Sequence, residues 1–262
     1  MKTGFSHRLG SMLRVDFRRM GKSRLFWILL GCALVMPILM TVMMAMMDGS
    51  VSVDPQTGAE SILHGPENTW QNIGTLPGGE AMGGMDVFAM CNINMVFMLA
   101  AVFICLFIAG DFRSGFAKNL FTVRAKKGDY ILSKLLCGSL CGNLMLLAYF
   151  AGSVLGGAMA GLSFDLHGLT GGNLAMCMLS KLCLMPVFIA IYVLVSVAAK
   201  QRGWLCLCGS LGGGMLLFMM VGMITPLGST MMNVLLCLAG SALFAAGLGA
   251  AGCAVLKKTS LV

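Results

Sequence analysis

Six unbroken apolar stretches, each near the length of a membrane-crossing helix, constrain this chain more than any other feature of its sequence. They lie at about residues 25–47, 87–110, 132–160, 180–199, 204–224 and 232–256. An α-helix needs about 20 apolar residues to cross about 30 Å of hydrocarbon. The 262 residues are 58% hydrophobic and 11% charged, which is more apolar surface than one soluble core can hide. We therefore expect an all-α membrane protein with six transmembrane helices.

Lysine and arginine are segregated between the segments that connect these stretches. All but one of the 18 bases fall in residues 1–24, 111–134, 200–202 and 257–258. The loop 48–86 carries carboxylates and no base. Because basic segments translocate poorly, we expect both termini and the loop 111–131 in the cytoplasm, with 48–86 outside. The net charge of +8 then reflects topology and anionic lipid, and no nucleic acid is expected as a partner.

Lys181 is the exception to this segregation, because it stands at the outer start of the fourth apolar stretch. A side chain that snorkels to the outer interface would be structural, whereas one that faces an internal cavity would be functional. The residues from Leu182 to Ala199 are enough to cross the membrane without Lys181, which favours the structural interpretation.

The segment before the first stretch has an apolar stripe. Phe5, Leu9, Leu13, Phe17 and Met20 recur at spacings of three or four, and arginines occupy the other faces. The pattern predicts an amphipathic helix over residues 4–21 that lies in the cytoplasmic membrane interface and contacts lipid. A simple basic anchor would explain the charges but not the stripe. The expected division is an interfacial segment 1–24, a transmembrane domain 25–256 and a cytoplasmic tail 257–262.

Small residues and cysteines inside the stretches have structural interpretations. Glycine pairs at spacing four, such as Gly138 with Gly142 and Gly152 with Gly156, favour close helix packing in a bundle or a dimer. Pro37 is expected to kink its helix. The 11 cysteines lie almost entirely in apolar surroundings, without the His or carboxylate partners that would complete a metal site.

Motifs for chemistry on this chain are missing. Neither HExxH nor GxSxG occurs, and the apolar stretches contain no mid-membrane carboxylate or histidine. The first absence argues against a protease, and the second argues against an ion-coupled carrier. Gly21-Lys22-Ser23 resembles the end of a phosphate-binding loop, but Asp16 stands where that motif needs its first glycine. We expect no catalysis and no cofactor on this chain.

The loop after the second stretch has an apolar pattern of its own. Phe112, Phe116 and Leu120 are spaced by four, which predicts one face of a short helix. A connection that only fixes orientation would need charge but not this stripe.

At this loop the sequence resembles the ABC-2 type permeases, particularly bacterial subunits related to those of bacteriocin and peptide-antibiotic immunity transporters. In that family an acidic or aromatic residue, a glycine and a Lys-Asn pair follow the second span, and a basic residue and a Ser-Lys pair come at the third. The matching residues here are Asp111, Gly115, Lys118, Asn119, Ser133 and Lys134, with Arg124 as a looser match.

The resemblance implies an ABC-2, type V exporter-like permease bundle in the bacterial plasma membrane. It implies the permease subunit of an ATP-binding cassette exporter for a peptide, drug or other amphipathic compound. ATP and Mg would then belong to two cytoplasmic ATP-binding subunits, and a second permease copy or paralogue would complete the transporter. The implied ATPase contact is Asp111, Phe112, Gly115, Phe116, Lys118, Asn119 and Leu120. The alternatives are a scaffold or sensor subunit that does not transport, and an ATP-independent carrier.

Overall fold

The computed structural model describes residues 5–53, 60–62, 65–66, 68–74, 92–123, 126–166, 168–199 and 202–258. Its helices are α1 (Phe5–Lys22), α2 (Arg24–Met46), α4 (Met95–Arg113), α5 (Phe116–Val123), α6 (Lys127–Ala160), α7 (Gly171–Ala199), α8 (Gly203–Ile224) and α9 (Met231–Lys258). Two short strands, β1 (Val51–Val53) and β2 (Glu60–Ile62), and the 3-10 helix η1 (Thr69–Asn72) lie between α2 and α4. Expectations for Lys2, Arg124, Lys200, most of the loop 48–86 and the tail 259–262 fall outside the described residues.

Five helices in the described residues are long and apolar enough to cross a membrane, namely α2, α4, α6, α7 and α9. The fifth predicted stretch, 204–224, forms α8, which packs against α4 and α7; its role as a further span stays a prediction. The helix at the fourth stretch is longer than predicted, because α7 begins at Gly171 and not near residue 180. Thr170 and Asn173 form hydrogen bonds with each other there, and they begin the helix well before its continuous apolar run.

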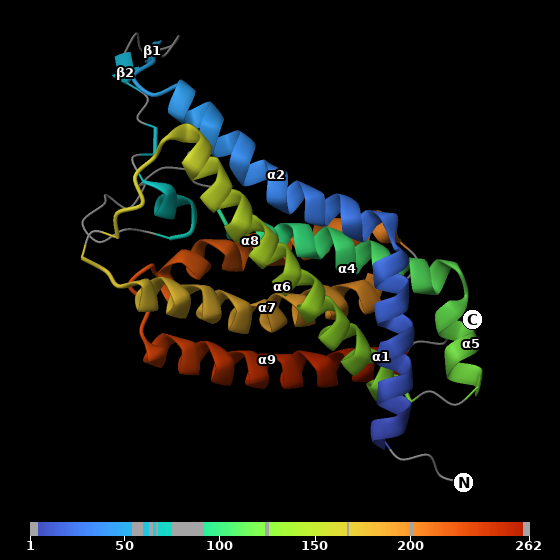
Figure 1. Ribbon diagram of the computed structural model, residues 1–262. Coiled ribbons are helices and arrows are strands. Elements are labelled where there is room, and N and C mark those ends of the chain that lie inside the picture. Colours follow the sequence, from blue (N-terminus) through green and yellow to red (C-terminus); the bar gives the residue numbers. More distant parts are fainter. Residues whose placement is uncertain are drawn as a thin grey trace.

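The connections alternate between two ends of the bundle. Lys127 Nζ donates to the Leu256 carbonyl at 2.6 Å, which holds the start of α6 beside the end of α9. Figure 1 shows α1 and α5 at this same end, which we call the basic end. At the opposite end, the far end, Asn68 bridges to Ser163 and the Asn173 amide donates to the Ser229 carbonyl at 3.3 Å. The alternation predicted from charge is thus present in the fold.

The N-terminal amphipathic segment forms α1, as predicted. It lies crosswise to α7 and α9 at the basic end (Figure 1). Met20 is buried against the bundle, whereas Leu9, Leu13 and Phe17 are half-buried and Phe5 is 55% exposed. The protein therefore covers only part of the apolar stripe, and the rest is free to contact lipid.

The glycine pairs bring helices of this chain together. A methyl group at Gly152 of α6 would lie 2.1 Å from the Leu34 carbonyl oxygen and 2.7 Å from Cγ of Pro37, both on α2. Real Cβ atoms do not approach other atoms so closely. Side chains of α4 and α7, Ile104 and Ile189, fill the corresponding space beside Gly138. Close packing within one chain therefore accounts for these glycines.

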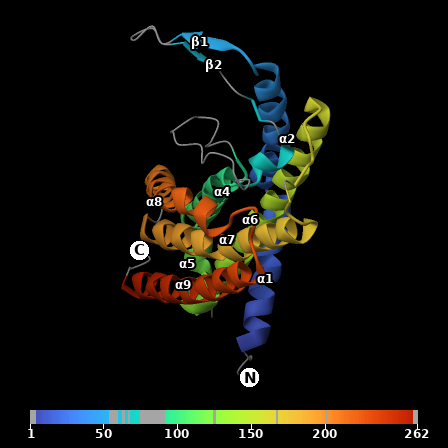
Figure 2. The same ribbon diagram turned by 90° about the vertical axis from the view of Figure 1, so that its left-hand side faces the viewer.

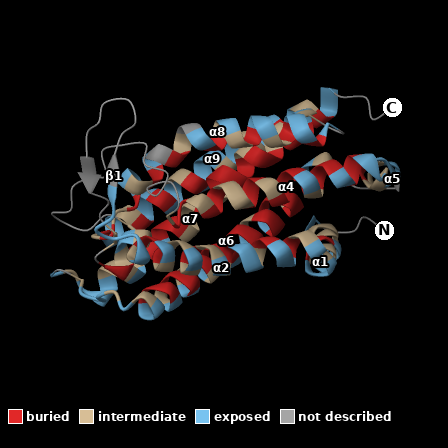
Figure 3. Ribbon diagram, turned by 90° about the horizontal axis from the view of Figure 1, so that it is seen from above, coloured by how far each residue is buried: buried red, intermediate tan, exposed pale blue. Residues whose placement is uncertain are grey.

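The surface of the bundle is apolar. Figure 3 shows buried residues on the inner sides of the helices and exposed residues on their outer sides. On α9 the exposed side chains include Leu236, Leu243 and Phe244, at 64%, 75% and 60%. A soluble protein does not expose so continuous an apolar face, and lipid is the solvent that suits it.

The far end is partly built from the loop between α2 and α4. Strands β1 and β2 pair antiparallel beyond the end of α2, and η1 packs against α2 and α6 (Figure 2). Trp70 of η1 stacks on Phe150 with ring centroids 6.4 Å apart, and its indole Nε1 donates to the Phe164 carbonyl at 3.0 Å. The described part of the α2–α4 loop is thus anchored to α6 and to the α6–α7 connection.

Candidate functional site

The loop that carries the family resemblance contains a helix break. Helix α4 continues to Arg113, Gly115 adopts φ 71°, and α5 begins at Phe116. Glycine has no Cβ and takes this left-handed conformation without strain, so the chain turns there. The prediction that Phe112, Phe116 and Leu120 share one face of a single helix is therefore wrong. Phe112 lies in the last turn of α4 and is 8% exposed, whereas Phe116 and Leu120 are half-buried on α5.

Helix α5 has an inner and an outer face. Phe116 and Leu120 point to α1, where they line a groove of about 280 Å³ with Met12 and Val15. The ring of Phe121 lies edge-on to Tyr130 of α6, with centroids 5.4 Å apart. Lys118, Asn119 and Thr122 are exposed. The inner face thus holds α5 to the bundle, and the outer face is free.

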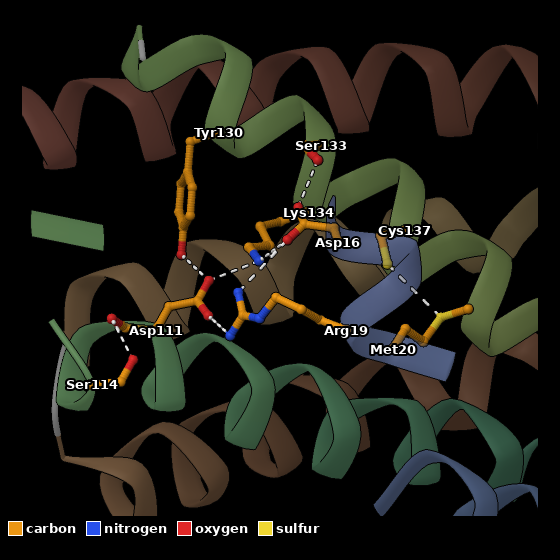
Figure 4. Close-up of polar contacts among 9 residues, drawn as sticks. All are labelled: Asp16, Arg19, Met20, Asp111, Ser114, Tyr130, Ser133, Lys134 and Cys137. Carbon is orange, nitrogen blue, oxygen red and sulfur yellow. Dashed lines mark hydrogen bonds and ion pairs between the residues drawn. The ribbon is translucent and has the colours of Figure 1, made fainter. Parts of the chain in front are cut away.

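Four charged side chains meet between α1, α4 and α6 and join these three helices (Figure 4). Lys134 of α6 places its Nζ 2.7 Å from Oδ1 of Asp16 on α1 and 2.7 Å from Oδ2 of Asp111 on α4. Arg19 of α1 pairs with the other oxygen of Asp111. Two carboxylates and two cations balance in charge, and we call Asp16, Arg19, Asp111 and Lys134 the ion cluster.

Hydroxyl groups and rings complete the surroundings of the ion cluster. Tyr130 donates to Asp111 Oδ2 at 3.1 Å, and Ser133 donates to Asp16 Oδ2 at 2.6 Å. The Arg19 guanidinium lies 4.4 Å from the centre of the Phe116 ring, and Lys134 Nζ lies 4.2 Å from that of Phe107. Both carboxylates and Lys134 are at most 1% exposed. Removing one partner of such a buried set leaves the others unpaired, which is costly.

The structure separates the predicted site residues into two groups. Asp111, Ser133 and Lys134 come together in the ion cluster or against it, whereas Lys118 and Asn119 lie apart on the outer face of α5. Sequence reasoning missed Asp16, Arg19 and Tyr130. A signal for Asp16 existed, because it is the sole carboxylate in residues 1–24 and stands three positions before Arg19.

Lys181 is buried inside the bundle, so the interpretation that it snorkels to the membrane interface is wrong. Its side chain is fully buried, and Nζ donates to Asn94 Oδ1 at 2.9 Å and to Thr225 Oγ1 at 2.8 Å. The reason is that α7 begins at Gly171, which puts Lys181 within the helix and not at its start. Neutral oxygens from the start of α4 and the end of α8 thus hold this ammonium group.

Together, these features define a class: a multi-pass helical membrane protein whose crosswise N-terminal helix is locked to two of the bundle helices by buried charge. The sequence matches the family described as ABC-2 family transporter protein over residues 12–210. The chain therefore belongs to that family. It is the membrane permease component of an ABC-2 transporter, which is not catalytic itself and works with an ATPase partner. Searches of curated proteins and of solved structures gave no match.

The matched range begins within α1 and ends within α8, so it includes the ion cluster, α5 and Lys181.

Proposed function

We propose that this chain is the permease subunit of an ATP-binding cassette exporter in the bacterial plasma membrane. Its cargo is a peptide, drug or other amphipathic compound. Two cytoplasmic ATP-binding subunits supply the energy, and a second permease copy or paralogue completes the transmembrane pathway. The observation that carries the proposal is the position of α5, a helix with an exposed outer face that is joined by one turn to a buried ion cluster.

The ion cluster gives α5 a mechanical connection to the bundle. Asp111 precedes the turn Ser114–Gly115 that leads into α5, and it is paired with Lys134 of α6 and Arg19 of α1. A force on α5 acts first on the last turn of α4. Since ion pairs join that turn to α1 and α6, the three helices respond together. Docking of an ATPase at α5 would thereby bias the whole basic end between two arrangements.

The ATPase contact that we propose contains fewer residues than the sequence led us to expect. Lys118 and Asn119 remain its centre, because they are exposed. Asp111 and Phe112 are buried, and Phe116 and Leu120 line the groove beside α1. These four, with the turn at Gly115, position α5 and do not insert into a partner in this arrangement.

The proposed orientation places the basic end in the cytoplasm. The two tryptophans near this end are Trp27 at the start of α2 and Trp204 at the start of α8, which are 59% and 71% exposed. Tryptophan gathers where a membrane meets water. Their position supports an interface at the basic end, and the excess of lysine and arginine there supports the cytoplasmic side.

Reversing a charge on the outer face of α5 tests the proposal. We choose Lys118→Glu and not a substitution at Phe116. A carboxylate at position 116 would stand beside Arg19 and disturb the ion cluster. We expect binding of the ATP-binding subunit and substrate-stimulated ATP hydrolysis to fall together, by about tenfold, as for a charged contact worth about 1.5 kcal/mol.

The matched control is Lys126→Glu, which makes the same charge change at an exposed position at the basic end but outside α5. It should leave co-purification and ATP hydrolysis near their normal levels. A Lys118→Glu protein that retains its ATPase and transports at the normal rate would contradict a coupling role for α5.

A further inference from the structure

The junction of α1 and α2 forms a basic hollow. The chain turns at Ser23, which has extended backbone angles of φ −75° and ψ 119° between the two helices. A cavity of about 390 Å³ opens beside this turn. Its lining residues are Arg18, Arg19, Lys22, Ser23 and Phe107. We call this cavity the elbow pocket.

The elbow pocket has positive charge that the protein does not neutralise. Arg18 and Lys22 are exposed, and neither has a carboxylate partner within the described part of the chain. The neighbouring Asp16 and Asp111 are already paired with Lys134 and Arg19. Arg18 and Lys22 are therefore available to an anion from outside the chain.

The elbow pocket lies at the start of α2, where the first backbone N–H groups of a helix have no acceptor within the helix. The Ser23 side chain does not cap α2, whose first turn has no acidic residue, so the positive end of that helix faces the turn uncompensated. Arg19 also lines the elbow pocket, but its guanidinium is turned toward Asp111 and Asp16, so it adds positive charge there and no free donor. An anion with several acceptor oxygens would suit these N–H groups and bases.

The position of the elbow pocket favours a lipid as the source of the anion. Beyond the turn, α2 exposes a line of apolar side chains, including Ile28, Val35 and Leu39, at 61%, 47% and 64%. Trp27 stands at the start of that line, and its Nε1 donates to the Gly21 carbonyl at 2.8 Å. An acyl chain along α2 would place its headgroup at the elbow pocket.

We propose that the elbow pocket binds the phosphodiester headgroup of an anionic phospholipid, with the acyl chains along the exposed face of α2. Arg18 and Lys22 contact the phosphate from the α1 side, and the amide groups of the first turn of α2 contact it from the other. The bound lipid stabilises the angle between α1 and α2, and so the position of Asp16 and Arg19 in the ion cluster. A free phosphate ion would offer the same anionic oxygens to the elbow pocket. The lipid differs from it by its acyl chains.

The test uses the full-length chain in bilayers of phosphatidylcholine that contain increasing fractions of phosphatidylglycerol with brominated acyl chains. Trp27, kept as the single tryptophan by replacing Trp70 and Trp204 with phenylalanine, reports contact through fluorescence quenching. We expect quenching that saturates at a low fraction of phosphatidylglycerol. In Arg18→Gln and Lys22→Gln the half-saturating fraction should rise by about fivefold each, as for one basic contact with anionic lipid.

Arg14→Gln is the matched control, because Arg14 is an exposed base of α1 that does not line the elbow pocket. Its quenching curve should equal that of the parent chain. Equal shifts in all three variants, or quenching that rises in proportion to the lipid fraction, would overturn the proposal in favour of diffuse attraction. Millimolar inorganic phosphate should leave the curve unchanged, and competition by it would assign the elbow pocket to a soluble anion.

Discussion

At the scale of residues, the buried charges explain why a short motif is spread over two segments. Asp111 follows the second apolar stretch and Lys134 begins the third, yet their side chains are 2.7 Å apart. The pair closes the α4–α6 connection, and Asp16 extends it to α1. Removing one member is costly because Asp16, Asp111 and Lys134 are buried and would lose a charged partner.

A double-mutant cycle on the ion cluster tests this dependence. Lys134→Met should lower the free energy of unfolding by about 3–5 kcal/mol, because it leaves Asp16 buried without its closest cation. Asp16→Asn alone should also destabilise the protein. The double variant should lose clearly less than the sum, by about 1 kcal/mol or more, because it removes both charges together.

The measurement is unfolding of the purified chain in mixed micelles of increasing denaturing-detergent content. Lys118→Met removes a base at an exposed position and should change stability by less than about 0.5 kcal/mol. Additive losses in the double variant would show that Asp16 and Lys134 are not energetically coupled.

How far the sequence predicts this site depends on which residues one considers. Asp111, Ser133 and Lys134 could be singled out, because they stand in a motif. Their meeting with Asp16 could not, because no local spacing relates α1 to α6. Lys181 was misplaced for a similar reason: hydropathy defines where an apolar run starts, whereas capping by Thr170 and Asn173 defines where the helix starts.

At the scale of elements, helix positions follow from the apolar stretches and helix ends do not. The α4–α5 region shows why, since a spacing of four treats Phe112 and Phe116 as neighbours on a helix while Gly115 turns the chain between them. The glycine pairs were correctly associated with close packing. The sequence left their partner open, and Gly152 in fact faces α2 of the same chain.

The close approach of α2 and α6 can be tested by adding a methyl group at Gly152. Gly152→Ala should destabilise the protein by about 1–3 kcal/mol, because its methyl group would overlap the Leu34 carbonyl oxygen, which belongs to the backbone and cannot rotate away. Unfolding in mixed micelles measures the effect.

Gly240→Ala in α9 is the matched comparison, since no atom lies within 4 Å of an added methyl group there. It should be neutral or slightly stabilising, because alanine favours helix over glycine. Equal stability of Gly152→Ala and Gly240→Ala would mean that α2 and α6 are not so closely packed.

At the scale of the whole molecule, the fold places basic and acidic connections at opposite ends. The basic end holds α1, α5, the start of α6 and the end of α9, and the far end holds β1, β2 and η1 (Figure 1). The charge pattern predicted this alternation because the lysine and arginine content of each connection can be read separately from the sequence. It could not predict that η1 would pack onto the α6–α7 connection, since that contact depends on the three-dimensional path of a long loop.

We propose that an ATP-binding subunit docks on α5 and that the basic end lies in the cytoplasm. Site-specific photocrosslinking in intact cells tests it most directly, with a photoreactive amino acid at Asn119 on α5 or at Phe164 at the far end. Both positions are exposed in the structure. We predict a crosslink to the ATP-binding subunit from position 119 and none from position 164. A crosslink from 164, or an assembled transporter that gives none from 119, would contradict the account.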